Sequence, residues 1–245
     1  MIETNTAKEL EKRIVYGKGI IPTPQKWITH FWAIHKERVI EFLKRPEHRA
    51  DSILLIGVGD GDILKDLGFQ RNTIVGIDLT LHVGTLVVAN KYCRAVLADG
   101  AMVPLKDASM DLVLCNMVLH HIDGQGDLER TLSECSRVLK NGGKLFVFEP
   151  NLFHPSGIAL NIINTFHLYN RLGGGSNYEY ALSPFRLSRI CKNNSLKDVE
   201  IRALTFGHPR FPLAIQKLLF RVDRYFSRLY PISYNFVLVA SKTVS

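Results

Sequence analysis

The sequence predicts an α/β fold built on a mostly parallel β-sheet, and three observations support this prediction. The middle of the chain alternates short apolar runs with segments of helical periodicity, which is the pattern of β-α-β units. The runs are rich in Val, Ile and Leu, as expected for strands that are buried on both faces. A glycine-rich turn follows the first run and leads into a helix. We therefore expect strands over residues 52–56, 73–77, 93–97, 111–116 and 144–149.

Boundary signals mark the other elements. Thr23-Pro24 is typical of a helix start with proline at the first helical position, and this helix should end before Pro46. A helix over residues 128–139 is followed by Lys140-Asn141-Gly142-Gly143, a good helix stop. Beyond this core we expect a turn or hinge at Gly173-Gly174-Gly175, helices over residues 183–191 and 212–229, and strands over residues 197–204 and 235–241.

The segments that flank the core are too short to be independent domains. We expect residues 1–50 to form an N-terminal helical cap segment. Residues 51–245 would form the main domain, with cap insertions over 152–182 and 206–231.

The composition is that of a compact globular protein. Hydrophobic residues make up 46% and charged residues 22% of the 245 positions, which argues against disorder. No run of about 18 apolar residues could span a bilayer, and the polar start does not resemble a signal peptide. The four cysteines form no CxxC pair, so we expect structural thiols and no metal site. These features favour a cytoplasmic protein.

Charge is divided unevenly along the chain. Residues 1–50 carry a net charge of +4 and residues 151–245 of +8, whereas residues 51–150 carry −4. The basic flanks favour an anionic partner: a phosphorylated or carboxylated substrate, a membrane surface or a nucleic acid. Solubility alone explains the asymmetry equally well.

The turn after the first strand carries Gly57, Gly59 and Gly61 in the spacing G-x-G-x-G. Glycines allow positive φ and let a ligand lie close to the main chain. A dinucleotide fingerprint would need its third glycine where Asp62 stands, and an acid at a helix start repels a pyrophosphate. The turn therefore favours a ligand that carries positive charge or no phosphate.

Two aspartates follow the next two predicted strands. Asp78 lies 21 residues after Gly57, where an acid at a strand end can accept hydrogen bonds from both ribose hydroxyls. Asp99 follows the third strand. An aspartate at a strand end is common, but the order and spacing of the three markers together indicate a nucleoside-containing cofactor.

These residues resemble the class I S-adenosylmethionine-dependent methyltransferases, a Rossmann-like family, and in particular its ubiquinone and menaquinone biosynthesis branch. The resemblance covers residues 52–150. It rests on the glycine turn, on both aspartates, and on the motifs Ala98–Leu105, Ser109–Val113, Leu119-His120-His121 and Leu139–Leu145.

The resemblance implies a seven-stranded, mostly parallel sheet with an antiparallel last strand and helices on both faces, and S-adenosylmethionine as cofactor. The turn from Gly57 through Asp60 to Gly61 would hold its methionine part and ribose. Many members have an acid where Leu55 stands, and Asp60 or Asp62 is the candidate to replace that contact to the cofactor's amino group. The remaining cofactor-binding residues would be Asp78 for the ribose hydroxyls, Leu79 next to it, Asp99 for the adenine amino group with Gly100 alongside, and Asn116 near the methionine end.

A base is needed only if the acceptor must lose a proton. His121, in the pair His120-His121 after the fourth strand, is our candidate for this catalytic role, and structural packing of the pair is the alternative. His30, His35, His154 and His167, in the cap segments, are further candidates.

The sequence lacks two motifs that are typical of enzymes that methylate nucleic acids. The stretch 116–119 replaces the Asn/Asp-Pro-Pro-aromatic motif of DNA amino methylation, and no Pro-Cys for cytosine methylation occurs, so direct nucleic-acid modification is disfavoured.

The segment 213–229 carries Lys217, Arg221, Arg224 and Arg228 at helical spacing, opposite apolar residues. Such a helix is a candidate for peripheral contact with an anionic membrane or for guarding an anionic substrate. The alternative is a solvated face of a cap helix.

We therefore expect a methyltransferase acting on a small-molecule, lipid-like or glycan-linked acceptor. An RNA methyltransferase and a non-catalytic S-adenosylmethionine-binding protein are the alternatives.

Overall fold

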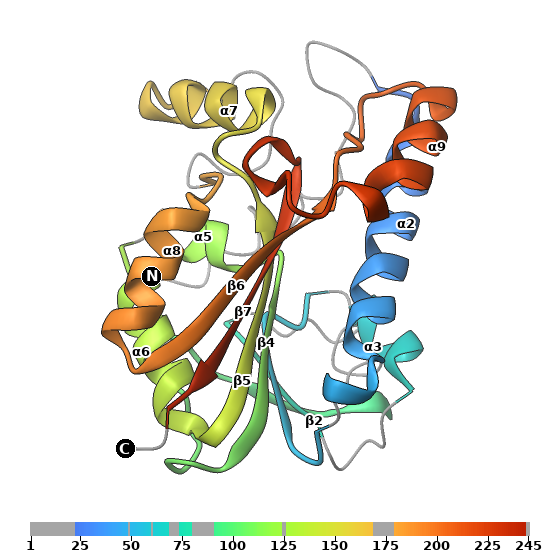
Figure 1. Ribbon diagram of the computed structural model, residues 1–245. Coiled ribbons are helices and arrows are strands. Elements are labelled where there is room, and N and C mark those ends of the chain that lie inside the picture. Colours follow the sequence, from blue (N-terminus) through green and yellow to red (C-terminus); the bar gives the residue numbers. More distant parts are fainter. Residues whose placement is uncertain are drawn as a thin grey trace.

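The computed structural model describes residues 23–48, 50–59, 61–68, 74–79, 91–123, 126–168 and 179–243 (Figure 1). The helices are α2 (Gln25–Leu43), α3 (Asp62–Leu67), α5 (Leu119–Asp123), α6 (Leu128–Val138), α7 (Pro155–Thr165), α8 (Pro184–Asn193) and α9 (Leu213–Val222), with 3₁₀ helices η1 (Pro46–His48), η3 (Asp223–Tyr225) and η4 (Tyr230–Ile232). The strands are β1 (Ile53–Ile56), β2 (Ile74–Asp78), β3 (Arg94–Leu97), β4 (Met110–Asn116), β5 (Leu139–Pro150), β6 (Leu196–Thr205) and β7 (Asn235–Lys242).

The strands form one seven-stranded sheet in the order β3-β2-β1-β4-β5-β7-β6. Strands β1 to β5 pair in parallel, and β7 is antiparallel to both β5 and β6. This confirms the predicted α/β fold with an antiparallel last strand. The chain builds outward from β1 to β3 and then returns to place β4 on the other side of β1, so the strand order reverses between β1 and β4.

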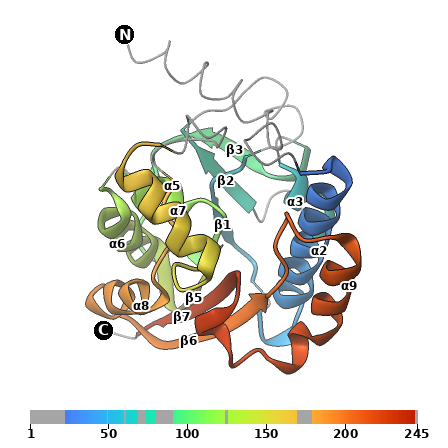
Figure 2. The ribbon, with the colours of Figure 1, turned by 90° about the horizontal axis from the view of Figure 1, so that it is seen from above.

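Helices cover both faces of the sheet, because successive residues of each central strand point to opposite sides. Leu54 and Ile56 of β1 pack in the core with α6 and α8, whereas Ile53 and Leu55 pack in the core with α2 and α3. The two groups of helices lie on opposite sides of the sheet in Figures 1 and 2. Each strand end is thereby held from both sides.

Residues 140–143 were predicted to end the preceding helix, but in the structure they do not lie at its end. Helix α6 ends one residue earlier than predicted, and β5 already begins at Leu139, which pairs with Met110. The next paired residue of β5 is Lys144, so the four residues between them interrupt the pairing. Gly142 adopts a φ of 77° there, a conformation that glycine reaches without strain. The glycine turn is therefore an irregularity within β5 and does not cap α6.

Two differences at helix ends also correct the sequence analysis. Helix α2 begins at Gln25, so Pro24 precedes the first helical position instead of occupying it. The helix predicted over residues 212–229 ends as α9 at Val222, and a 3₁₀ turn follows. Arg228 therefore lies outside the helix, and the predicted basic stripe is broken after Arg221.

The orientation of α9 also differs from the prediction. Its buried face carries Gln216 and Phe220, whereas Leu218 is exposed. Gln216 tolerates burial because its side-chain amide donates hydrogen bonds to three main-chain carbonyls, those of Trp27, Pro209 and Phe211. Since Trp27 belongs to α2, this side chain fixes α9 against the N-terminal helix.

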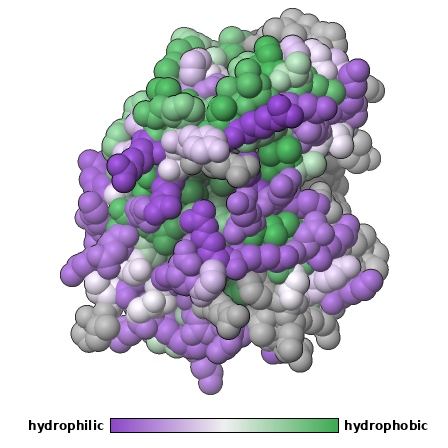
Figure 3. Space-filling model, turned by 45° about the vertical axis from the view of Figure 1, so that its right-hand side comes forward, coloured by the Kyte–Doolittle hydropathy of each residue, from purple (hydrophilic) through white to green (hydrophobic). Residues whose placement is uncertain are grey.

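Exposed apolar side chains gather at one end of the molecule. Figure 3 shows them over the end that carries α9, while the opposite end is mostly hydrophilic. Within the described part of the chain, no helix combines the length and apolar character that crossing a bilayer requires.

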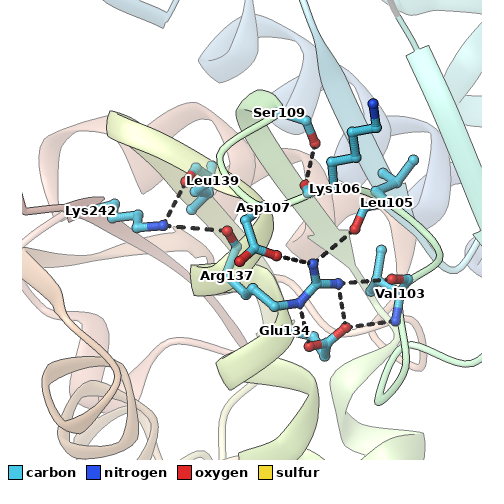
Figure 4. Close-up of polar contacts among 9 residues, drawn as sticks. All are labelled: Val103, Leu105, Lys106, Asp107, Ser109, Glu134, Arg137, Leu139 and Lys242. Atoms are coloured by element: carbon cyan, nitrogen blue, oxygen red, sulfur yellow. Dashed lines mark hydrogen bonds and ion pairs between the residues drawn. The ribbon is translucent and has the colours of Figure 1, made fainter.

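A charged clamp fixes the loop between β3 and β4, residues 98–109, which carries Asp99 (Figure 4). The Arg137 guanidinium on α6 pairs with Glu134 at 2.7 Å and donates hydrogen bonds to the carbonyls of Val103 and Leu105, each at 2.8 Å. Glu134 in turn accepts a hydrogen bond from the Val103 N–H at 2.8 Å. The main chain of the loop is thus bound to two side chains of α6.

We expect Arg137→Ala to lower the free energy of unfolding by about 2 kcal/mol, because several charge-assisted hydrogen bonds are lost together. Urea unfolding at neutral pH measures this. The control is Arg130→Ala on the same helix, whose side chain is 76% exposed and whose loss should cost less than about 0.5 kcal/mol. Equal effects of the two substitutions would contradict the clamp.

The clamp should also weaken in acid. The hydrogen bond from Arg137 holds the pKa of Glu134 below its ordinary value of 4.5. Because the folded pKa lies below the unfolded one, this stabilisation is present above pH 4.5 and is lost as the pH falls through the lowered pKa. The difference between wild type and Arg137→Ala should shrink over that range.

Candidate functional site

The glycine turn joins β1 to α3 at the point where the strand order reverses, which is where open α/β sheets bind ligands. Gly57, Gly59 and Gly61 adopt positive φ of 77°, 57° and 71°. A Cβ at Gly57 would lie 2.6 Å from Cγ2 of Val118, so packing requires glycine there. Among the residues that the structure describes, none would come within 4 Å of a Cβ at Gly59, so its main chain is open to a ligand on that side.

Asp78 ends β2 directly beside this turn. Its Oδ2 accepts a hydrogen bond from the Gly59 N–H at 3.0 Å. Leu79, the next residue, is 54% exposed. Asp60 lies outside the described residues, so its contact with the cofactor stays a prediction.

Asp99 and Gly100 follow β3, as their sequence positions predicted. Asp99 is exposed, and its Oδ1 accepts a hydrogen bond from the Ala101 N–H at 2.8 Å. Gly100 is buried, and a Cβ there would lie 3.3 Å from side-chain atoms of Ile56 and Thr131. Packing explains this glycine, and its contact with adenine stays a prediction.

Asn116 ends β4 and is oriented by a residue of the N-terminal helix. Asn235 donates its side-chain N–H to Nδ1 of His35 at 3.1 Å, so His35 carries its proton on Nε2 and donates it to Oδ1 of Asn116 at 3.3 Å. Burial lowers the pKa of His35 to about 4, which keeps the ring neutral. Sequence reasoning considered His35 only as a base, and the structure shows that both ring nitrogens are engaged by the protein.

Glu149, at the end of β5, was not predicted as a site residue. Its carboxylate is fully buried and accepts hydrogen bonds from the N–H groups of Val118 and Leu119 at 2.8 and 2.7 Å. The other oxygen lies 2.6 Å from Nδ1 of His120. The acid at the end of the apolar run 144–149 was the only signal for it in the sequence.

The histidine pair has two different environments. The His120 side chain is held by Glu149, whereas Nδ1 of His121 lies 3.8 Å from Oε1 of Glu179. The ring centroids of His120 and His121 are 4.0 Å apart, and the His121 side chain is 25% exposed. His121 therefore remains the candidate base, and this role stays a prediction.

Rings from four separate segments meet near Asn116 and define an aromatic cluster. Tyr234 contacts Phe31, His154 and His208 with ring centroids 5.3, 5.3 and 4.8 Å apart. On α2 the cluster continues to the His35 ring that binds Asn116. Its members are Phe31, Trp32, His35, His154, His208 and Tyr234.

These features fit an adenosyl cofactor that lacks a pyrophosphate. The open main chain at Gly59 can pass beside a ligand, and the adjacent Asp78 carboxylate suits ribose hydroxyls. Among the described residues, no group of three His, Cys, Asp or Glu side chains could hold a metal ion.

Comparison with known proteins points the same way. Residues 54–147 match the family model described as a methyltransferase domain. The chain is 26% identical over 161 residues to a ubiquinone biosynthesis O-methyltransferase of Cupriavidus pinatubonensis, which covers 62% of each chain. It is 30% identical over 145 residues to a Mus musculus protein named "Probable tRNA methyltransferase 9B", which covers 58% of this chain and 30% of that protein. The chain thus spans less than two thirds of either relative.

A solved structure shares the fold over most of its length. An S-adenosylmethionine-dependent methyltransferase from Thermotoga maritima superposes with a TM-score of 0.62 and 20% identity, covering 89% of this chain and 94% of that one. The sheet order and the glycine turn are those that the resemblance to the α/β methyltransferases predicted. Residues 54–147 therefore form a methyltransferase domain of the class I, S-adenosylmethionine-dependent kind.

Gly59→Ala tests whether a ligand uses the open space. We expect a stability loss of about 1 kcal/mol from the positive φ, and at least a tenfold loss of S-adenosylmethionine affinity by calorimetry. The control is Gly142→Ala, which also has a positive φ and open space but lies in the β5 irregularity. An equal loss of affinity in both variants, or in neither, would contradict the site.

Proposed function

We propose that the protein transfers the methyl group of S-adenosylmethionine to a small, apolar or lipid-like acceptor. The aromatic cluster beside Asn116 carries this proposal. Burial lowers the pKa of His35 and of His208 to about 4, so both rings are neutral at physiological pH. An uncharged aromatic surface suits an apolar ring or chain better than a phosphate backbone, which Lys and Arg contact.

S-adenosylmethionine supplies a methyl group that is already activated by its positively charged sulfur. The chain then has to hold an acceptor in line with that methyl, and orientation supplies much of the rate. Trp32 and Tyr234, which are partly exposed, would pack against an apolar acceptor. His121 would accept the proton of a hydroxyl acceptor.

Thermal-shift titration with S-adenosylmethionine, S-adenosylhomocysteine and NAD tests the cofactor. A ligand at about 100 times its Kd adds about 2.7 kcal/mol of stability. The adenosyl ligands should raise the Tm of the wild type and not of Asp78→Ala, since Asp78 lies beside the glycine turn. Stabilisation by NAD alone would overturn the assignment.

The acceptor is tested in the same preparation with radiolabelled S-adenosylmethionine. A phenol that carries a long alkyl chain should be methylated faster than the same phenol without the chain, and tRNA should not be methylated. The relative named as a tRNA methyltransferase supports the competing function. Methylation of tRNA that falls steeply with salt would establish an RNA acceptor instead, because phosphate contacts release counterions.

We expect His121→Ala to lower kcat with a hydroxyl acceptor by about 100-fold, the usual contribution of a positioned base. The KM for S-adenosylmethionine should not change. His167 was a further candidate base, but it is exposed beyond the end of α7 and outside the aromatic cluster, so His167→Ala serves as the control and should leave kcat unchanged. An unchanged kcat would assign His121 a structural role beside Glu179.

A further inference from the structure

Helix α7 exposes a stripe of apolar side chains, and the helix carries no charged residue. Ile158 and Ile162 lie four residues apart on one helix face, and Phe166 follows after the same interval at the C-cap; they are 46%, 56% and 68% exposed. Residues 151–168 contain no Asp, Glu, Lys or Arg. A surface helix normally turns charged side chains to water, so this face is unusual for one that meets only solvent.

The segment from α9 to η4 exposes a second group of apolar side chains, interleaved with cations. Leu218 and Tyr225 are 61% and 77% exposed, and Ile232 is 59% exposed. The nearby Lys217 and Arg221 are exposed as well. Asp223, the acid of this segment, is buried and accepts a hydrogen bond from the Phe206 N–H, so it does not neutralise the surface.

Both groups lie at the end of the molecule where the parallel strands finish. Figures 1 and 2 place α7 and α9 at this end, and Figure 3 shows its apolar surface. The same segments carry the aromatic cluster, because His154 is the N-cap of α7, His208 precedes α9, and Tyr234 follows η4. The segments that expose the apolar surface therefore also supply residues to the proposed acceptor side.

We propose that this end of the molecule, formed by α7, α9, η3 and η4, docks on an anionic lipid bilayer. Apolar side chains beside cations match the acyl chains and anionic headgroups of such a surface. The docked protein would turn its acceptor side to the bilayer, and this last step rests on the proposed lipid-like acceptor.

Vesicle sedimentation with the full chain tests the proposal. The wild type should sediment with phosphatidylcholine–phosphatidylglycerol vesicles and much less with phosphatidylcholine vesicles, because the cations face anionic headgroups. Phe166→Ser should lower binding to the anionic vesicles about tenfold. Its control is Phe166→Leu, which keeps an apolar side chain at this 68% exposed position and should keep vesicle binding.

The charge contribution has a matched control as well. Lys217→Glu with Arg221→Glu should lower binding to anionic vesicles at least tenfold, whereas Lys192→Glu with Lys197→Glu, on α8 and β6, should lower it less than threefold. A wild type that remains in the supernatant with both vesicles, or equal losses in both double variants, would overturn the proposal.

Cofactor binding separates this result from the proposed function. Each variant is titrated with S-adenosylmethionine by thermal shift, which also shows that it is folded. Loss of vesicle binding with cofactor binding retained assigns the effect to the surface. Vesicle binding by a wild type that does not bind S-adenosylmethionine would keep the docking surface and overturn the methyltransferase function.

Discussion

The candidate site depends on one buried carboxylate, that of Glu149. A buried carboxylate without partners costs several kcal/mol, so the N–H groups of Val118 and Leu119 and the His120 ring must stay around it. This requirement fixes the turn after β4, where Met117 adopts a φ of 53°, a conformation that costs a non-glycine residue about 1 kcal/mol. The same turn places the Val118 side chain where any residue other than glycine at position 57 would collide with it.

Much of the fold could be predicted because its signals are local. Apolar runs predicted β1 to β4 to within one residue at each end, since a strand buried on both faces must be apolar throughout. The glycine spacing predicted the turn after β1, where all three glycines adopt positive φ. The start of β5 was missed, because its pairing with Met110 depends on a partner strand and not on its own sequence.

The interactions that orient the site could not be predicted, because they join residues that are distant in sequence. His35 reaches Asn116 across 81 positions and Asn235 across 200, and no local pattern marks such a pair. The orientation of α9 was missed for a related reason. A helix is expected to bury its apolar face, but Gln216 takes the buried position because carbonyls from α2 and from the preceding loop accept its amide N–H groups.

The cofactor side and the proposed acceptor side of the site differ in charge, and they come from different parts of the chain. The cofactor side lies in the acidic middle segment, where Asp78 and the exposed Asp99 suit a nucleoside and a cationic sulfur. The proposed acceptor side comes from α2 and from the segments after β5, where burial lowers the pKa of His35 and of His208 to about 4. An acceptor that partitions into such surroundings is scarce in water and abundant in a bilayer. If the acceptor is lipid-like, as proposed, the exposed apolar side chains on the same segments would bring the site to the bilayer that holds it.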